Sequence, residues 1–290
     1  MTAASDILTT LATRVAATYI DGTRPAAILL TGSAAEGVSD HFSDLDLIAY
    51  YERLPSLGDL ASAQTQLGAT ERRVSSDPEA GSMIVEEYGF QGIECQMAHV
   101  TIASWERNMA SILTDFTAAT TAEKAIMGLL GGVALHGSDL IGRWQTQAET
   151  YPDGLAQATV EHHLRFFPLW LAAERWAARD ATIFYHQMLV DSSFNLLGVL
   201  AGVNHLYFST FQFKRLHRFV SGMHAAPPRL ADRLDELFGL DPVSAGGALE
   251  RLVEETVTIV EERLPAVDTA AVRRTLGMRH DPWSPTNESS

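Results

Sequence analysis

The chain of 290 residues contains one cysteine, and its 36 acidic residues far outnumber its 21 basic ones. A single cysteine, Cys95, excludes an internal disulfide and is typical of a reducing compartment, so we expect a cytoplasmic protein. No apolar run approaches the roughly 20 residues that a membrane span needs. The first residues also lack the basic start and apolar core of a secretion signal. We therefore expect no association with a membrane.

Basic residues are scarce, and the formal net charge is −15. The chain has two lysines, Lys124 and Lys214, and the first 119 residues hold six arginines against sixteen acidic residues. Proteins that bind nucleic acid gain affinity by neutralising phosphates with Lys and Arg. The composition therefore argues against a nucleic-acid substrate and favours a small molecule, which acidic residues would recognise well if it is cationic.

Two aspartates stand one residue apart in an apolar segment. Because side chains of a strand alternate between its faces, Asp44 and Asp46 point the same way, and Leu45 and Leu47 point into a core. Two carboxylates side by side repel each other unless a cation lies between them. Mg²⁺ is a hard ion that binds carboxylate and phosphate oxygens together, so this pair predicts a magnesium site.

A Gly-Ser turn follows the preceding apolar strand, 26–31. Gly32 allows the backbone to bend close to a ligand. Ser33 is placed to begin a helix, whose free N–H groups favour phosphate. We therefore expect Gly32 and Ser33 to bind phosphate beside the aspartates.

Together these features resemble the signature of the nucleotidyltransferase superfamily, whose fold DNA polymerase beta shares. That signature is an apolar residue, Gly, Gly or Ser, a spacer of roughly ten residues, and then Asp, an apolar residue, Asp or Glu, and another apolar residue. Here Gly32-Ser33 precedes the spacer 34–43 and Asp44-Leu45-Asp46-Leu47, and only Thr31, in the first apolar slot, departs from the signature. The spacer looks most like that of the small-molecule branch, such as the streptomycin, kanamycin and lincosamide enzymes.

The resemblance implies a third carboxylate on a neighbouring strand. The segment 92–100 supplies Glu94, which alternates with apolar residues. Glu86 and Glu87 are rivals on the preceding strand, but they are expected beside a turn, where a carboxylate is usually solvated. By resemblance, Asp44 and Asp46 would each bind a metal ion, with two Mg²⁺ expected. Glu94 would complete the metal site or deprotonate the acceptor hydroxyl, and both roles stay open.

The element order predicts an α+β fold in which a small mixed sheet carries helices on one face. We expect a catalytic domain at 1–118, a helical domain at 119–278 and a disordered polar tail at 279–290. Helical periodicity and the placement of Pro, Gly and Asn give the boundaries in the second domain. The helices expected there are 122–135, 140–147, 155–178 (kinked at Pro168), 182–203, 210–221, 228–238, 245–263 and 267–276.

The helical half also resembles uncharacterised nucleotidyltransferase relatives, through a helix that ends in Asn, two residues, Tyr and Phe at 204–208. The lysine position of those relatives corresponds to Lys214, which would contact phosphate around the leaving pyrophosphate. The alternative is that Lys214, Arg215 and Arg218 form a solvated helix face. Histidines such as His163 are expected to be hydrogen-bonded structural residues among core aromatics.

The sequence thus predicts a Mg²⁺-dependent nucleotidyltransferase that moves an NMP from an NTP to a hydroxyl of a small molecule, with release of pyrophosphate. ATP is the default NTP by analogy with the antibiotic-modifying branch. Two alternatives are a catalytically silent member that binds nucleotide or a partner protein, and an enzyme that modifies a protein. The nucleobase, the acceptor and the oligomeric state stay open.

Overall fold

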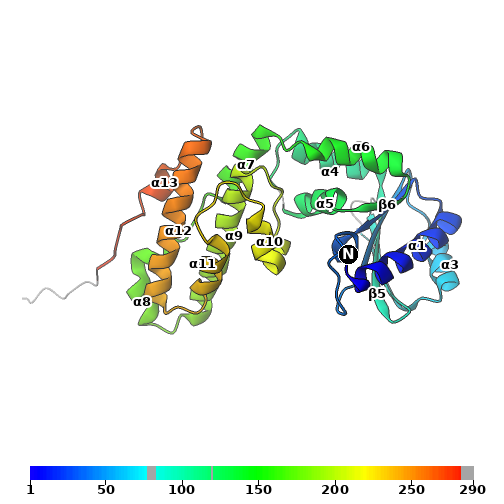
Figure 1. The fold of residues 1–290 in the computed structure, drawn as a ribbon, viewed down its shortest axis with the longest axis horizontal. Coiled ribbons are helices and arrows are strands. Elements are labelled where there is room, and N and C mark those ends of the chain that lie inside the picture. Colours follow the sequence, from blue (N-terminus) through cyan, green and yellow to red (C-terminus); the bar gives the residue numbers. More distant parts are fainter. Residues whose placement is uncertain (77–82, 119, 282–290) are drawn as a thin grey trace, which may run out of the picture. The chain divides into compact units, whose positions relative to one another are not determined.

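The computed structural model describes residues 1–76, 83–118 and 120–281, and the chain forms two compact units (Figure 1). The first, the sheet unit, comprises Met1–Asp115 and Thr121–Thr150. The second, the helical unit, comprises Phe116–Thr120 and the chain from Tyr151 onward. The predicted α+β class is confirmed. The boundary predicted after residue 118 differs from this division, because residues 121–150 belong to the sheet unit.

A six-stranded sheet organises the first unit, in the order β3-β4-β5-β2-β1-β6. β2 and β5 are parallel, whereas the other neighbouring strands are antiparallel, so the predicted mixed sheet is confirmed. The strands are β1 (Ala27–Thr31), β2 (Leu45–Tyr51), β3 (Thr70–Ser76), β4 (Met83–Phe90), β5 (Ile93–Thr101) and β6 (Val133–His136).

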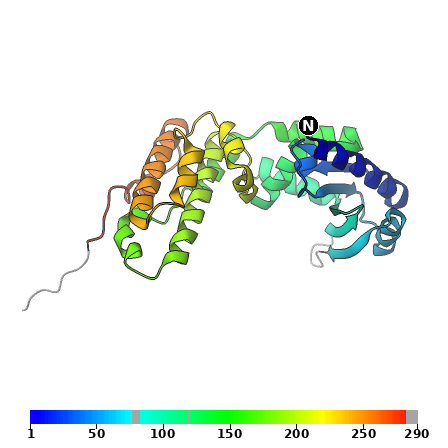
Figure 2. The ribbon, with the colours of Figure 1, turned by 60° about the horizontal axis from the view of Figure 1, so that its bottom comes forward.

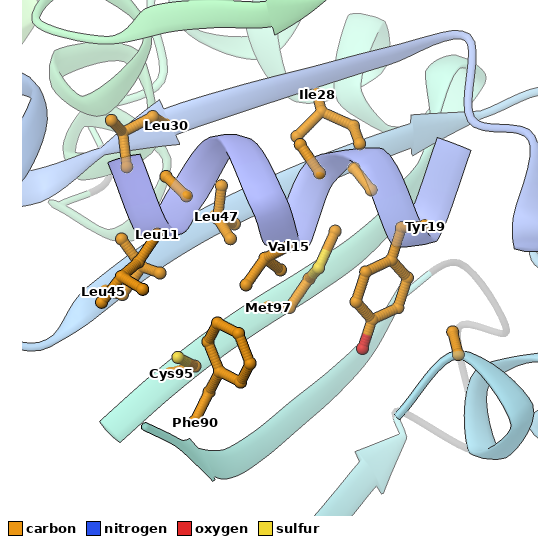
Figure 3. Packing of buried hydrophobic residues seen from close by; sticks show 14 of the residues in the cluster. Leu11, Val15, Tyr19, Ile28, Leu30, Leu45, Leu47, Phe90, Cys95 and Met97 are labelled. Carbon is orange, nitrogen blue, oxygen red and sulfur yellow. The ribbon is translucent and has the colours of Figure 1, made fainter. Parts of the chain in front are cut away.

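One face of the sheet, which we call the core face, packs against α1 (Ala3–Thr23) and α3 (Leu57–Leu67). Figure 3 shows Val15 of α1 over Leu47 of β2 and Met97 of β5. These side chains are buried, as is Cys95 on β5. Burying an apolar side chain of this size stabilises the fold by about 1.5–3 kcal/mol. Alternation along β2 and β5 therefore fixes which residues face away from this core.

Side-chain caps begin the helices around this core. Ser56 and Asp59 form a reciprocal capping box at the start of α3, as expected for a Ser that precedes an apolar helix. Thr2 caps the start of α1 by accepting a hydrogen bond from the backbone N–H of Ser5. Thr101 caps α4 (Ile102–Leu113) in the same way, by accepting from the backbone N–H of Ser104.

The other face of the sheet, the second face, also carries helices. Tyr50 of β2 contacts Trp105 of α4 and Trp144 of α6 (Ser138–Glu149), with ring centroids 5.6 and 4.9 Å apart. α5 (Thr120–Leu130) also contacts this face, through β1. The prediction of helices on one face was therefore wrong. β2 has apolar residues on both faces at its far end, and both sides need cover.

Residues 131–136 depart from the predicted helix 122–135. Gly131 and Gly132 follow the end of α5, and the next residues form β6, which pairs with β1 at the edge of the sheet. β3 was not predicted either. Both are edge strands, whose formation depends on a partner strand distant in the sequence rather than on local periodicity.

A polar cluster is buried on the core face. Glu86 and His99 are both 0 % exposed, and Glu86 Oε2 lies 2.7 Å from His99 Nε2. The same carboxylate accepts hydrogen bonds from the Tyr19 hydroxyl and the Gln64 amide, both at 2.6 Å. Tyr51 Oη lies 3.1 Å from the other ring nitrogen of His99. A buried carboxylate is tolerated when its oxygens are paired in this way.

The helical unit follows the predicted helices in part. α9 has the predicted bounds, whereas 155–178 is broken near Pro168 rather than kinked, and 210–221 is split in two. A proline lacks the N–H that a continuous helix would use. The elements are α7 (Asp153–His163), η1 (Leu169–Ala172), α8 (Ala173–Ala177), α9 (Thr182–Val203), η2 (Thr210–Arg215), α10 (Leu216–Ser221), α11 (Leu230–Leu237), α12 (Pro242–Arg263) and α13 (Ala270–Arg273), and Figure 2 gives a second view of them.

Two further expectations bear on this unit. Residues 279–290 were predicted to be disordered, yet Arg279 forms an ion pair of 2.6 Å with Glu250; residues 282–290 lie outside the described chain. His163 is buried, and its Nδ1 lies 3.2 Å from Asn195 Oδ1, in agreement with a structural role. Burial lowers the pKa of His163 to about 4. In the part of the chain that the structure describes, no helix is long and apolar enough to cross a membrane.

Candidate active site

A row of polar side chains crosses the second face of the sheet. Strand pairing places its members opposite one another, and directly paired residues point to the same face. The row runs, from β3 to β1, through Arg73, Glu87, Gln96, Asp46 and Thr31. The neighbouring row on the core face is mostly apolar. The predicted aspartate position therefore belongs to a polar surface that spans five strands.

Asp46 lies directly against the Gly-Ser turn. It pairs with Thr31 at the end of β1, and its side chain is half-buried. Gly32 has a φ of +69°, and a Cβ built on it would lie 2.5 Å from Asp46 Oδ2. The absent side chain therefore leaves space for the carboxylate, in a conformation that glycine adopts at little cost. The two features that the sequence singled out are in contact.

Glu94 shares the face of Asp46, and Asp44 lies directly before β2. Asp44 precedes Leu45 and Glu94 precedes Cys95, and the two following residues pair across β2 and β5. Both acids are exposed, whereas Leu45 and Cys95 are 0 % exposed on the core face. Burial raises the pKa of the Cys95 thiol to about 12, with contributions from the negative charges of Asp44 and Glu94. Asp44 and Glu94 therefore lie next to each other, each just before one residue of the pair Leu45 and Cys95.

The rivals of Glu94 lie in different places. Glu86 belongs to the buried cluster of the core face, not to a solvated strand end as expected, and cannot join the aspartates. Glu87 is on the second face, where its Oε1 accepts a hydrogen bond of 3.4 Å from Gln96 Nε2. It is separated from β2 by β5, whereas Glu94 is on the strand next to the aspartates.

Ser33 lies on α2 (Gly32–Ala35), as the predicted turn into a helix requires. Its hydroxyl oxygen is 3.0 Å from that of Ser39, a residue that is 3 % exposed. The backbone of Ser39 is held in turn by the hydroxyls of Ser5 and Thr2, at 3.0 and 2.8 Å. The start of α1 therefore fixes the loop that leads from the turn to the aspartates.

Lys214, the remaining predicted site residue, belongs to the helical unit. It lies on η2, not on the predicted continuous helix, and its side chain is exposed. Its Nζ lies 5.0 Å from the centroid of the Phe211 ring, a cation–π distance. The contact with phosphate stays a prediction.

Residue chemistry and position both bear on whether a metal ion fits. Asp44, Asp46 and Glu94 offer hard oxygen donors on one face, as Mg²⁺ prefers, and Gly32 leaves one carboxylate room. Across residues 1–76, 83–118 and 120–281, however, no three His, Cys, Asp or Glu side chains are grouped closely enough to hold an ion. The three carboxylates therefore provide the kind of donor atom that Mg²⁺ prefers. In this structure they are not grouped closely enough to bind one ion together.

Sequence reasoning missed part of this surface. Gln96 and Arg73 are members of the polar row, and neither was considered for the site. Gln96 could have been found, because it lies two residues after Glu94 and shares its face by alternation. Arg73 could not, because β3 and its register with β4 were not predicted.

No family model and no curated protein matches this chain. Among solved structures, the chain is similar to a nucleotidyltransferase-like protein from Exiguobacterium sibiricum, with 11% sequence identity and a TM-score of 0.41. The alignment covers 94% of this chain and 80% of that one. The likeness is too distant to assign a reaction or a residue role.

Proposed function

We propose that the protein transfers a nucleoside monophosphate from an NTP, with ATP as the default, to a hydroxyl of a small molecule. The observation that carries this proposal is the contact between Asp46 and Gly32. It joins a carboxylate surface to a turn that a polyphosphate can approach, and the acids Asp44 and Glu94 share that surface. Such a combination suits a substrate that arrives with a divalent cation.

The chain's own residues have distinct roles in this scheme. Asp44 and Asp46, with Glu94, would hold Mg²⁺, and Ser33 would donate a hydrogen bond to a phosphate oxygen. Bound ions would stabilise the attacking and leaving oxygens of an in-line displacement. The acceptor oxygen attacks the α-phosphorus, the bond to the β-phosphate oxygen breaks, and pyrophosphate leaves. Glu94 would either take the acceptor's proton or hold metal.

The acidic surface also supports the choice of acceptor. Glu87 lies in the polar row beside the proposed centre, and the chain carries a net charge of −15. Nucleic acid would be repelled by such a surface, whereas a small cationic molecule would be attracted. Hydroxylated antibiotics are one class of acceptor with these properties.

The test is pyrophosphate release from each of the four NTPs, with and without Mg²⁺, against a panel of hydroxylated small molecules. We expect Asp44→Asn and Asp46→Asn to lower the rate by at least ~100-fold, because charge at the reacting phosphate is a large part of catalysis. Asp40→Asn is a matched control. Its carboxylate caps a turn of the same loop by accepting from the Phe42 N–H and the Ser43 hydroxyl.

The outcomes separate the alternatives. Glu94→Gln is expected to impair transfer far more than Glu87→Gln, and the reverse result would reassign the third carboxylate. Full turnover in Asp44→Asn or Asp46→Asn would contradict the proposal. Nucleotide binding without pyrophosphate release would indicate the silent alternative, and label from ATP on a protein of a cell lysate would indicate a protein acceptor.

A further inference from the structure

The sheet unit contains a single lysine, Lys124, and it lies on α5. α5 is held against β1, the strand that leads into the Gly-Ser turn. The Thr31 hydroxyl donates a hydrogen bond of 3.2 Å to the Gly128 carbonyl. A Cβ at Gly128 would lie 2.8 Å from that hydroxyl, and one at Gly132 would lie 2.6 Å from Leu29 Cδ1. The backbone of this segment therefore lies directly on the strand.

These two contacts give the direction of α5. As the segment advances from Gly128 to Gly132, its partner on β1 moves back from Thr31 to Leu29. α5 and β1 therefore run in opposite directions. Residues before Gly128 lie beyond Thr31, over the chain that continues into Gly32.

Lys124 precedes Gly128 by four residues, so the two share a face of α5, about one turn apart. Gly131, which directly follows α5, also lies close to this region, because a Cβ there would lie 3.6 Å from Glu36 Cγ. This part of the chain therefore lies alongside the Gly-Ser turn and Glu36, the residue after α2. The side chain of Lys124 is exposed.

The charge at this place favours a positively charged side chain in addition to the metal ions of the proposed function. A triphosphate would meet the carboxylates of Asp44, Asp46 and Glu94, whose negative charge repels it. Arg14 lies 5.4 Å from the Phe90 ring centroid, and Arg72 donates a hydrogen bond to the Thr65 hydroxyl. Arg73 is at the far end of the polar row, three strands away from Asp46.

We infer that Lys124 binds phosphate: its ammonium group donates hydrogen bonds to the triphosphate of an NTP held at Gly32 and Ser33. This inference rests on the proposed function and assigns the sheet unit a cation of its own for the phosphates. Lysine serves phosphate as a point charge with three donors, and it tolerates the varied geometry of a bound triphosphate.

The first experiment measures the Kd of a fluorescent ATP analogue with Mg²⁺ for wild type, Lys124→Ala and Lys124→Arg. A charge-assisted hydrogen bond of about 1.5–3 kcal/mol corresponds to roughly 10–100-fold in Kd, and we expect Lys124→Ala to lose that much. Lys124→Arg keeps the charge and should bind within ~3-fold of wild type, since one charge replaces another. Alanine favours a helix, so thermal melting should show both variants folded.

Arg143→Ala is the matched control, because it removes one exposed positive charge from α6. α6 meets the opposite end of α5, where the Gln145 amide donates to the carbonyls of Leu129 and Gly132. The Kd of Arg143→Ala for the ATP analogue should equal that of wild type. If Arg143→Ala weakens binding as much as Lys124→Ala, the effect is one of net charge and the inference fails.

The second experiment uses the scarcity of lysine. Acylation followed by mass spectrometry reports Lys124 and Lys214 separately in the unmodified protein, and the Mg²⁺–ATP complex should protect Lys124. Bound nucleotide with Lys124 unprotected, or equal affinity in Lys124→Ala, would overturn this inference and leave the proposed function standing. No binding of any NTP to the wild type would overturn both.

Discussion

The two faces of the sheet treat neighbouring carboxylates in opposite ways. Glu86 and Glu87 are consecutive on β4, yet Glu86 is 0 % exposed and bonded to Tyr19, Gln64 and His99. Glu87 lies on the second face, in the polar row that includes Asp46. Which face a carboxylate occupies, and not its residue type, decides whether it holds the fold together or remains available to a ligand.

Replacing Glu86 should give the largest effect. Glu86→Ala leaves three buried polar partners without their acceptor, and each buried polar group left unsatisfied costs about 1–3 kcal/mol. We expect the free energy of unfolding, measured with urea, to fall by at least ~3 kcal/mol. Glu87→Ala is the matched control on the second face and should change it by less than ~1 kcal/mol. Equal losses of stability in the two variants would contradict the view that Glu86 supports the fold and Glu87 does not.

Gly32→Ala should have the next largest effect, and it addresses the second face alone. Gly68 is a close match, because its φ is +70°, near the +69° of Gly32, and a Cβ there would meet nothing within 4 Å. Both changes should cost about 1–2 kcal/mol of stability for the left-handed conformation.

Only Gly32→Ala also places a methyl group on the Asp46 carboxylate. A displaced catalytic group can cost on the order of 100-fold in rate. We therefore expect nucleotidyl transfer to fall by that order in Gly32→Ala and to stay near wild type in Gly68→Ala. A similar rate in both would show that the contact with Asp46 does not matter for transfer.

Alternation made the centre of the sheet predictable from the sequence. A period of two placed Asp44 and Asp46 opposite Leu45 and Leu47, and the structure keeps this arrangement in β2. The same argument placed Glu94 on the outward face of β5. Ser56 and Thr101 cap α3 and α4 through bonds to residues three positions away, so these helix starts depend only on residues that are close in sequence.

What could not be predicted depends on contacts between distant segments. The apolar residues of 133–136 suit a helix as well as a strand, and pairing with β1 decides for the strand. Glu86 was expected at a solvated strand end, because nothing near it in sequence reveals His99 or Gln64. Lys124 was not considered for the site, since its place beside the turn follows from the packing of Gly128 on Thr31.

The test with the smallest expected effect concerns which face of the sheet Cys95 occupies. It changes no residue and measures the reactivity of the Cys95 thiol. Cys95 lies on the core face between the exposed residues Glu94 and Gln96, and burial raises its pKa to about 12. The thiolate is the reactive form, so a disulfide reagent at pH 8 should label the native protein slowly and the urea-unfolded protein at once. Rapid labelling of the native protein would place Cys95 on the second face. Because a shift of one residue in register turns every side chain of a strand to the other face, Glu94 would then point into the core and could not join the aspartates.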